Sequence, residues 1–200
     1  MVAGEDANDR KIVTHLVQEF CPSLGAKVVE IRDDVRLKSA TGANLTQRIQ
    51  TLVRKAKARA LREGAGLAGI VVHEDLDGVT DETYDRVRRA ISAELAKHSP
   101  CGTALALAAW ESEAWLLLFP AAFPAVRPGW RLPVQLHRRD TGQLTDPKEL
   151  LQTKLPAPRY RESDGPDLIA AARKHGLLRA GPVGLNRSYA EFVGELKQWA

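Results

Sequence analysis

Apolar residues recur at two spacings in the N-terminal half of the chain, and these spacings predict an alternation of helices and strands. Helical spacing is found at 6–20, 44–64 and 81–98. Short runs rich in apolar or β-branched residues are found at 26–32, 68–72 and 103–109. Strands that alternate with helices of this length imply right-handed crossovers. The pattern therefore predicts the α/β class, with a mainly parallel sheet covered by helices on both faces.

Proline interrupts the chain repeatedly after residue 119, which predicts short helices separated by loops. Asp146-Pro147 combines a cap with a proline at the first helical position, so a helix is expected to begin there. Two further short helices are expected at 167–175 and 188–199. We therefore expect two parts, an α/β domain at 1–119 and a mostly helical C-terminal extension at 120–200 that packs on it.

Composition is that of a soluble globular protein. The chain has 200 residues, of which 44% are hydrophobic and 27% are charged, so it can bury a substantial core. The longest apolar stretch, 104–119, is interrupted by Glu111 and Glu113, so no membrane span is expected. The first residues lack the pattern of a signal peptide, and Cys21 and Cys101 lack the spacing of a zinc motif. A cytoplasmic location is the expectation.

Basic residues exceed acidic ones, and the net charge of +4 favours an anionic partner such as nucleic acid. The basic residues crowd one predicted helix, at Arg48, Arg54, Lys55, Lys57, Arg59 and Arg62. A solvated helix face carries such residues routinely, so the cluster is compatible with a binding surface and with ordinary solvent exposure.

Carboxylates follow directly on the apolar run at 68–72, in the segment His73-Glu74-Asp75-Leu76-Asp77-Gly78. In an extended strand Asp75 and Asp77 would project to the same side, at the carboxyl edge where open α/β sheets bind ligands. Adjacent carboxylates repel each other, and a cation such as Mg²⁺ or Mn²⁺ relieves that repulsion. The alternative is a helix cap formed by this segment and Thr80 or Asp81, although capping needs only one such residue.

Glu5 follows Val2-Ala3-Gly4, where a first parallel strand would end and the first helix would begin. The positive end of that helix favours a carboxylate. With Asp75 and Asp77, Glu5 would complete an acidic triad at neighbouring strand ends. Three carboxylates around one or two Mg²⁺ ions are the minimal set of groups that phosphoryl transfer requires.

The order of Glu5 and the Asp75-Leu76-Asp77 pair resembles the toprim domain, the Mg²⁺-binding module of topoisomerases, primases and nucleases of bacterial defence systems. Four further segments are similar to landmarks of stand-alone bacterial toprim-like proteins, at 109–117, 146–151, 160–161 and 186–192. The resemblance implies a toprim-like sheet and a Mg²⁺ (or Mn²⁺) cofactor bound by Glu5, Asp75 and Asp77. It also implies a catalytic set made of these three residues and Glu113.

The function implied by the resemblance is a Mg²⁺-dependent nuclease that hydrolyses phosphodiester bonds of DNA or RNA. Such a protein would act in a bacterial or phage-related antiviral defence system, with a partner protein in a defence complex. One alternative is a non-catalytic toprim-like subunit that binds or regulates within a larger complex. A third hypothesis is an α/β protein in which Asp75 or Asp77 accepts a phosphoryl group.

Two residues inside the acidic segment have roles that the sequence leaves open. Strand alternation points Glu74 away from Asp75 and Asp77. His73 shares the side of the two aspartates, so it could ligate a metal or act as an acid, or it could be a packed core histidine.

The segment 110–119 is also expected to be helical. Glu111 and Glu113 lie about 200° apart on such a helix, so at most one of them can face the centre, and the resemblance favours Glu113. Lys148 and Lys154 could contact phosphate or be solvated. The chain contains no P-loop, no dinucleotide-binding glycine motif and no serine-hydrolase elbow.

Overall fold

A computed structural model describes residues 1–22, 25, 27–33 and 36–199. The N-terminal half forms β1 (Val2–Ala3), α1 (Ala7–Phe20), β2 (Glu30–Ile31), α2 (Gly42–Arg62), β3 (Gly69–Asp75), α3 (Glu82–His98) and β4 (Gly102–Ala108). The C-terminal part forms α4 (Glu113–Leu116), α5 (Phe123–Val126), α6 (Pro147–Lys154), α7 (Gly165–Lys174), α8 (Leu177–Ala180) and α9 (Arg187–Lys197), with short 3₁₀ turns between them. The predicted α/β class with a helical C-terminal extension is confirmed.

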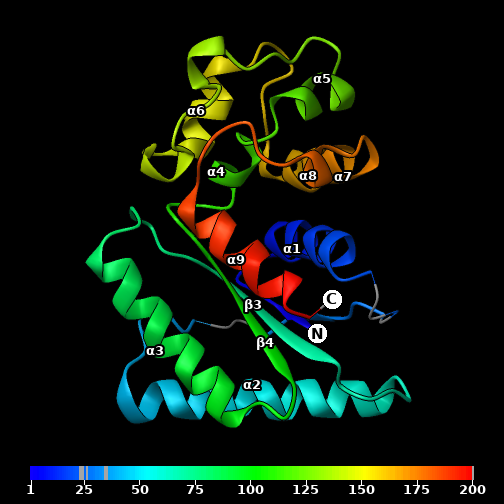
Figure 1. The fold of residues 1–200 in the computed structure, drawn as a ribbon, viewed down its shortest axis with the longest axis vertical. Helices are drawn as coiled ribbons and strands as arrows, with labels where there is room; N and C mark the ends of the chain where they lie inside the picture. The colour runs from blue at the N-terminus through cyan, green and yellow to red at the C-terminus, as the bar shows by residue number, and fades with distance from the viewer. Residues whose placement is uncertain (23–24, 26, 34–35, 200) are drawn as a thin grey trace.

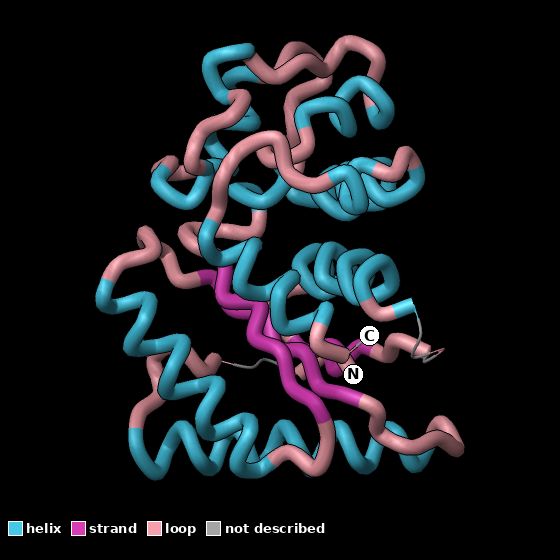
Figure 2. Tube along the Cα trace, in the orientation of Figure 1, coloured by secondary structure: helices cyan, strands magenta, loops and turns pink. Residues whose placement is uncertain are grey.

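The four described strands form one parallel sheet in the order β2-β1-β3-β4. Helices α2 and α3 lie on one face, and α1 and α9 lie on the other (Figure 1). The C-terminal helices and loops between α4 and α8 lie beyond one end of the sheet (Figure 2). Because every strand runs in the same direction, the carboxyl ends of β1, β3 and β4 meet at a single edge.

Alternation along β3 assigns each side chain to one face. Val71 belongs to the core beneath α1 and α9, whereas Ile70 and Val72 belong to the core beneath α2 and α3. Continued to the end of the strand, this period places His73 and Asp75 on the α1 side and Glu74 on the α2 side. The core on the α1 side also includes Trp115 and residues of the C-terminal segments, so the sheet and the extension share apolar packing.

Strand β4 is an outermost strand of the sheet, and its free side is covered by the last helix, α9. In β4 the amide N of Leu105 donates a hydrogen bond to Glu195 of α9 (2.7 Å), and the carbonyl O of Leu105 accepts one from Arg88 of α3 (3.0 Å). Arg88 and Glu195 also form an ion pair. This arrangement satisfies edge groups that would otherwise be free to pair with another strand.

Two local expectations differ from the structure. Among the described residues of the predicted strand at 26–32, only Glu30–Ile31 form a strand, and residue 26 lies outside the described residues. In the described part of the chain β2 pairs with β1 alone. Because β1 has two residues, it offers no hydrogen-bond partners for a longer β2. The expected helix at 110–119 is a single turn, Glu113–Leu116. Trp110 has a positive φ of 58°, which is incompatible with a helix that begins there.

Among the described residues, no helix is long and apolar enough to cross a membrane.

Candidate metal centre

His73 and Asp75 come from the carboxyl end of β3 and lie on the same face of the sheet. The distance from His73 Nε2 to Asp75 Oδ1 is 3.4 Å. The His73 ring is completely buried, and its plane is perpendicular to the indole of Trp115 at a centroid distance of 6.2 Å. Gly4 allows the β1–α1 turn to approach this ring, because a Cβ at position 4 would lie 3.0 Å from His73 Cβ.

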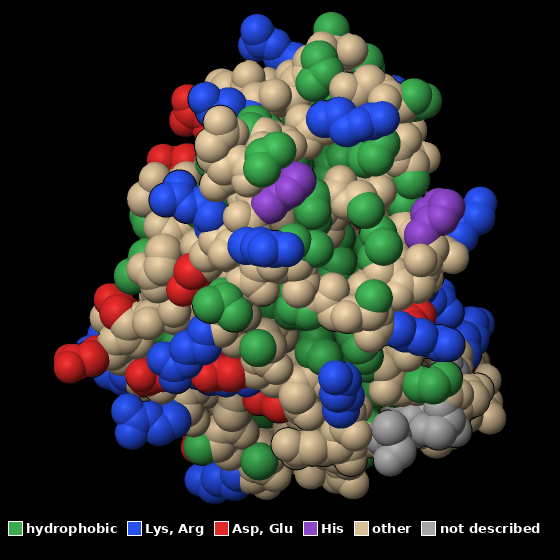
Figure 3. Space-filling view, turned by 45° about the horizontal axis from the view of Figure 1, so that its top comes forward, with side chains coloured by type: hydrophobic (Ala, Val, Ile, Leu, Met, Phe, Trp, Pro, Cys, Tyr) green, Lys and Arg blue, Asp and Glu red, His purple; other side chains and the backbone are tan. Residues whose placement is uncertain are grey.

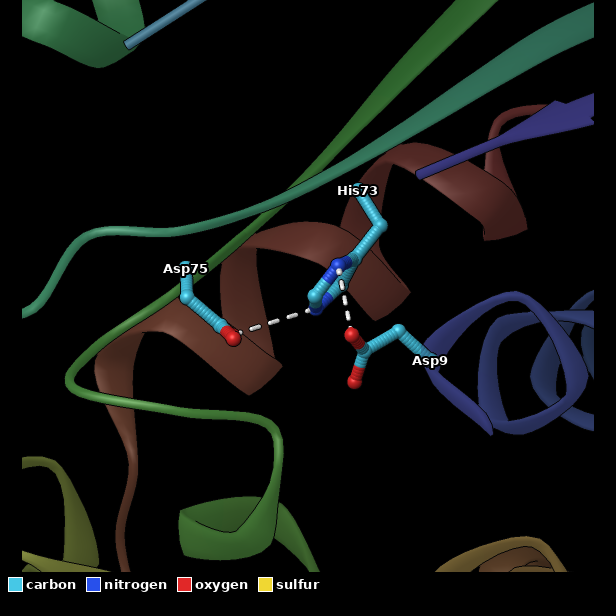
Figure 4. A group of neighbouring side chains, drawn as sticks. All are labelled: Asp9, His73 and Asp75. Atoms are coloured by element: carbon cyan, nitrogen blue, oxygen red, sulfur yellow. Dashed lines mark ion pairs between the residues drawn. The ribbon is translucent and has the colours of Figure 1, made fainter. Parts of the chain in front are cut away.

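Asp9 joins these two residues from the first turn of α1. The helix begins after Asp6, whose side chain accepts hydrogen bonds from the amides of Asn8 and Asp9. Asp9 therefore needs no capping role of its own, and its buried carboxylate points toward His73, with Asp9 Oδ2 3.8 Å from His73 Nδ1 (Figure 4). The N-terminal end of the helix favours a negative charge at this position.

Asp9, His73 and Asp75 each offer one ligand atom, and these atoms lie within 4.8 Å of one another. Ligands at about 2.1 Å from a metal ion are separated by about 3.0–3.4 Å when adjacent and by about 4.2 Å when opposite. The limit of 4.8 Å is slightly above the spacing of opposite ligands, so the three atoms lie near, but not at, the spacing that a shared cation requires. Neither ring nitrogen of His73 has a hydrogen-bond partner, although both are buried. A buried polar atom left unpaired is costly, and a metal bond would satisfy one of these nitrogens.

Ser112 holds the two aspartates from the loop after β4. Its hydroxyl donates to Asp9 Oδ1 (2.7 Å), and its backbone N donates to Asp75 Oδ1 (3.1 Å). The loop is placed by backbone bonds to the segment after β3, since Asp77 N donates to Trp110 O (3.1 Å) and Trp110 N donates to Gly78 O (2.7 Å). The centre is therefore built by α1 and by the loops that follow β3 and β4.

Burial makes the negative charge at this centre expensive. Burial raises the pKa of Asp75 well above its usual range, and the nearby carboxylates of Asp9 and Glu113 act in the same direction. Burial likewise raises the pKa of Glu113 to about 7. Carboxyl groups in such surroundings bind either protons or a cation, because several unneutralised charges in a dry pocket repel one another.

Glu113 and Glu111 take different directions, as the sequence predicts for two residues separated by one position. Glu113 Oε1 accepts a hydrogen bond from the buried Tyr160 hydroxyl (3.1 Å). Glu111 instead pairs with Lys148, at 3.0 Å between Glu111 Oε1 and Lys148 Nζ, and Lys148 also contacts Glu162 (3.1 Å). Partial burial lowers the pKa of Lys148, but hydrogen bonds to these two glutamates outweigh that effect and raise the pKa above its ordinary value. Lys148 is therefore an ion-paired residue at the rim of the centre.

Glu5 and Asp77, which the sequence groups with Asp75, meet at a lysine. The Nζ of Lys38 lies 2.5 Å from Asp77 Oδ2 and 3.8 Å from Glu5 Oε1, and it donates to the backbone O of Asp75 at 2.5 Å. Strand β3 ends at Asp75, and Asp77 has a positive φ of 57°, so the alternation that would place Asp77 beside Asp75 stops. The Asp77 side chain is 68% exposed. The structure thus brings Glu5 and Asp77 to Lys38, outside the Asp9–His73–Asp75 group.

Glu74 lies on the opposite face of β3, as alternation predicts. Its carboxylate accepts hydrogen bonds from the backbone N of Leu37 (2.7 Å) and of Lys38 (3.3 Å). Burial raises the pKa of Glu74 to about 7. Glu74 therefore anchors the segment that carries Lys38 to the end of β3.

Sequence reasoning missed Asp9, Ser112 and Lys38. Asp9 looks like one of several cap residues, and its only distinguishing signal is its position four residues after Glu5, in the first turn of the helix that follows β1. Ser112 sits between the two glutamates that attract attention in that segment. Lys38 lies in a polar connection with no motif, and only packing brings it to the end of β3.

Comparison with known proteins adds no relative. No protein-family model, no curated protein and no solved structure matches this chain. The case for a function therefore depends on the geometry of the Asp9–His73–Asp75 group and the charges around it.

Proposed function

We propose that the protein is a divalent-cation-dependent phosphodiesterase that cleaves nucleic acid. Asp9, His73 and Asp75 are the proposed ligands of the cation, and Glu5 and Asp77 are proposed to act beside Lys38 at the margin of the same centre. The observation that carries the proposal is the convergence of the buried Asp9 and the partly buried Asp75 on a buried histidine whose ring nitrogens have no hydrogen-bond partner. This group lies at the carboxyl ends of parallel strands, where α/β folds bind their ligands.

The donor set supports a divalent cation and bears on which one. Two carboxylates suit both Mg²⁺ and Mn²⁺. An imidazole nitrogen binds Mn²⁺ and other transition metals more readily than it binds Mg²⁺. We therefore propose Mn²⁺ as the better fit and Mg²⁺ as the weaker one. A bound dication would neutralise phosphate charge and lower the pKa of a water molecule.

The residues around the proposed ligands supply the remaining needs of phosphodiester hydrolysis. The reaction adds water across a P–O bond, so one group must accept a proton from water and the leaving oxygen must gain one. A group that exchanges a proton near neutral pH is best suited to this task, and burial raises the pKa of Glu113 to about 7. Lys38 offers a partly exposed ammonium beside Asp77, where it could contact a phosphate oxygen.

Membership of the toprim superfamily, and a role in bacterial or phage-related defence with a partner protein, are proposals that depend on the resemblance of the sequence motifs. The parallel sheet and the position of Glu5 and Asp75 at its carboxyl edge are compatible with that resemblance. In this protein the proposed ligand set differs from Glu5, Asp75 and Asp77, because Asp9 and His73 are the residues whose potential ligand atoms lie within 4.8 Å of that of Asp75 and of each other.

The decisive experiment combines metal binding with cleavage. Calorimetry with Mn²⁺ is expected to show a site in the wild-type protein that Asp75→Asn and Asp9→Asn each weaken strongly. Labelled single-stranded DNA, duplex DNA and RNA are then incubated with the same proteins in Mn²⁺, in Mg²⁺ and in EDTA. We expect Asp75→Asn to reduce cleavage about a hundredfold or more, because a metal contributes several kcal/mol to such reactions.

Asp167→Asn is the matched control, since it makes the same chemical change at an exposed position in α7. Melting profiles in EDTA verify that each variant is folded. Cleavage that persists unchanged in Asp75→Asn would exclude a catalytic metal centre here. Mn²⁺ binding without cleavage of any of the three substrates would instead favour the non-catalytic binding subunit.

A further inference from the structure

Helix α2 carries an unusual concentration of positive charge. Its 21 residues, Gly42–Arg62, include six lysines and arginines and no aspartate or glutamate. All six basic side chains are exposed, whereas the apolar side of the helix, which includes Ile49 and Ala56, is buried against the sheet and α3. In Figure 1 this helix runs along the outer side of the molecule, with its far face turned away from the sheet. Solvent therefore meets a helix surface that is basic along much of its length.

Four of the basic residues lie in a single row. At 100° per residue, Arg48, Lys55, Arg59 and Arg62 fall within about 60° of one another around the helix axis. We call these four residues the α2 row. With a rise of about 1.5 Å per residue, the row is about 21 Å long. One strand of a nucleic acid duplex places a phosphate every 3.4 Å along its axis, so the row matches about six phosphates.

The charges of the α2 row remain available to a ligand. Lys55 pairs with Asp33 (2.6 Å) and Arg59 pairs with Glu63 (2.9 Å), but both basic side chains are about half exposed, and such pairs exchange readily with other anions. In the part of the chain that the structure describes, no carboxylate forms an ion pair with Arg48 or Arg62. Among the described residues, a polyanion would thus meet two cations without a carboxylate partner, Arg48 and Arg62, and two more that can exchange their partners.

A cavity beside the row is lined by hydrogen-bond donors. It has a volume of about 570 Å³. Its lining includes Arg36, Arg48 and Lys55, with the polar side chains of Asn44, Gln47 and Thr51 between them. Asp33 is the one carboxylate among its described lining residues, and Lys55 already pairs with it. Such a lining suits phosphate oxygens, which accept hydrogen bonds from both cations and neutral donors.

The first residue of the row is linked to the segment that carries Lys38. The Arg48 guanidinium donates a hydrogen bond to the carbonyl O of Arg36. The next two residues, Leu37 and Lys38, bind Glu74 through their backbone amides, and Lys38 reaches Asp77. One short segment therefore connects the first residue of the row to the carboxyl end of β3.

The face of the molecule that carries the C-terminal helices has a different character. Figure 3 shows Lys and Arg side chains spread over this face, with apolar side chains between them and most of the acidic side chains along one side. A continuous row of basic residues without intervening acids is a feature of α2.

We propose that the α2 row binds the sugar–phosphate backbone of a nucleic acid strand, independently of its sequence, and directs that strand toward the metal centre. The second half of this proposal rests on the proposed function, whereas the first half does not. Contacts to phosphates position a strand without specifying a sequence, which is what side chains of this kind on a helix surface provide.

The test measures binding without cleavage. A fluorescent 24-nucleotide single strand is titrated with protein in EDTA, and anisotropy gives Kd at several salt concentrations. The variant Arg48→Gln/Lys55→Gln/Arg62→Gln is compared with Lys11→Gln/Arg86→Gln/Lys174→Gln, which removes the same charge from exposed positions on α1, α3 and α7. Circular dichroism verifies that both remain folded.

We expect the α2 variant to weaken binding about tenfold or more at 0.1 M salt, and to reduce the slope of log K against log[salt] by about 2 to 3. The control variant should change both quantities much less. Equal losses in the two variants would overturn the proposal, because binding would then follow net charge alone. A loss of binding to phosphatidylserine vesicles in the α2 variant, with oligonucleotide binding unchanged, would overturn it as well.

The outcome is separable from that of the proposed function. Asp75→Asn should bind the oligonucleotide as tightly as the wild-type protein in EDTA, because it leaves α2 untouched. If the protein cleaves no substrate but the α2 variant still loses binding, the surface assignment stands and the catalytic proposal fails.

Discussion

Glu113 provides the sharpest test of the electrostatics inferred for the centre. Glu113 is only 6% exposed, and burial raises the pKa of its carboxyl group from an ordinary value of 4.5 to about 7. Replacement by glutamine removes the charge, and the new amide oxygen can still accept the hydrogen bond of Tyr160. The variant therefore isolates the cost of ionising one carboxyl group in this pocket.

The sign and size follow from proton linkage. Because the folded state binds the Glu113 proton more tightly than the unfolded state does, the wild-type protein loses stability as pH rises from about 4.5. The loss is complete above pH 7. One pKa unit corresponds to 1.36 kcal/mol, so the full penalty is about 3 kcal/mol. Glu113→Gln should therefore be more stable than the wild-type protein by about that amount at pH 8.5, and nearly equal to it at pH 4.5.

Urea denaturation in EDTA at the two pH values measures this difference. Glu82→Gln is the matched control, because Glu82 is exposed at the start of α3, and it should shift the free energy of unfolding by less than about 0.5 kcal/mol at either pH. A gain in Glu113→Gln that is the same at pH 4.5 and pH 8.5 would show that the effect is not ionisation. The absence of any gain at pH 8.5 would refute the inferred burial cost.

Three further outcomes are expected. Ser112→Ala removes the hydroxyl that orients Asp9 and should weaken Mn²⁺ binding about 10–100-fold in calorimetry, even though the backbone bond to Asp75 remains; an unchanged affinity would mean that Asp9 is not a ligand. Glu195→Ala leaves the amide of Leu105 without its partner and should lower the free energy of unfolding by about 1–3 kcal/mol in urea. Mn²⁺ at 100 times its dissociation constant should stabilise the wild-type protein by about 2.7 kcal/mol relative to EDTA, and no shift would argue against a site in the folded state.

The geometry also suggests how charge is balanced without a metal ion. Lys38 occupies the space between Glu5 and Asp77. Burial lowers the pKa of Lys38, but the hydrogen bond to Asp77 and the nearby carboxylates raise it above its ordinary value. This lysine offsets the carboxylates at the margin of the centre, and its hydrogen bond to Asp75 goes to the backbone oxygen. The inner group of Asp9, His73 and Asp75 is left as the place where a cation would gain most.

The sequence by itself determined α1, α2, α3, β3 and β4, and the face on which each residue at the end of β3 lies. The pattern at 6–20 predicts α1 to within a residue of Ala7–Phe20, and strand alternation correctly separates His73 and Asp75 from Glu74. Both properties are local, because they depend on the spacing of apolar residues and on the pleat of a single strand.

Only the tertiary structure decided which groups meet. Asp9 reaches His73 because α1 packs across the sheet, and Ser112 reaches both aspartates because the loop after β4 is bonded to the loop after β3. Asp77 leaves the side of Asp75 because its backbone adopts a left-handed conformation that alternation does not foresee. Distances between segments far apart in the chain are set by packing and by irregular loops, and neither has a period that can be recognised in the sequence.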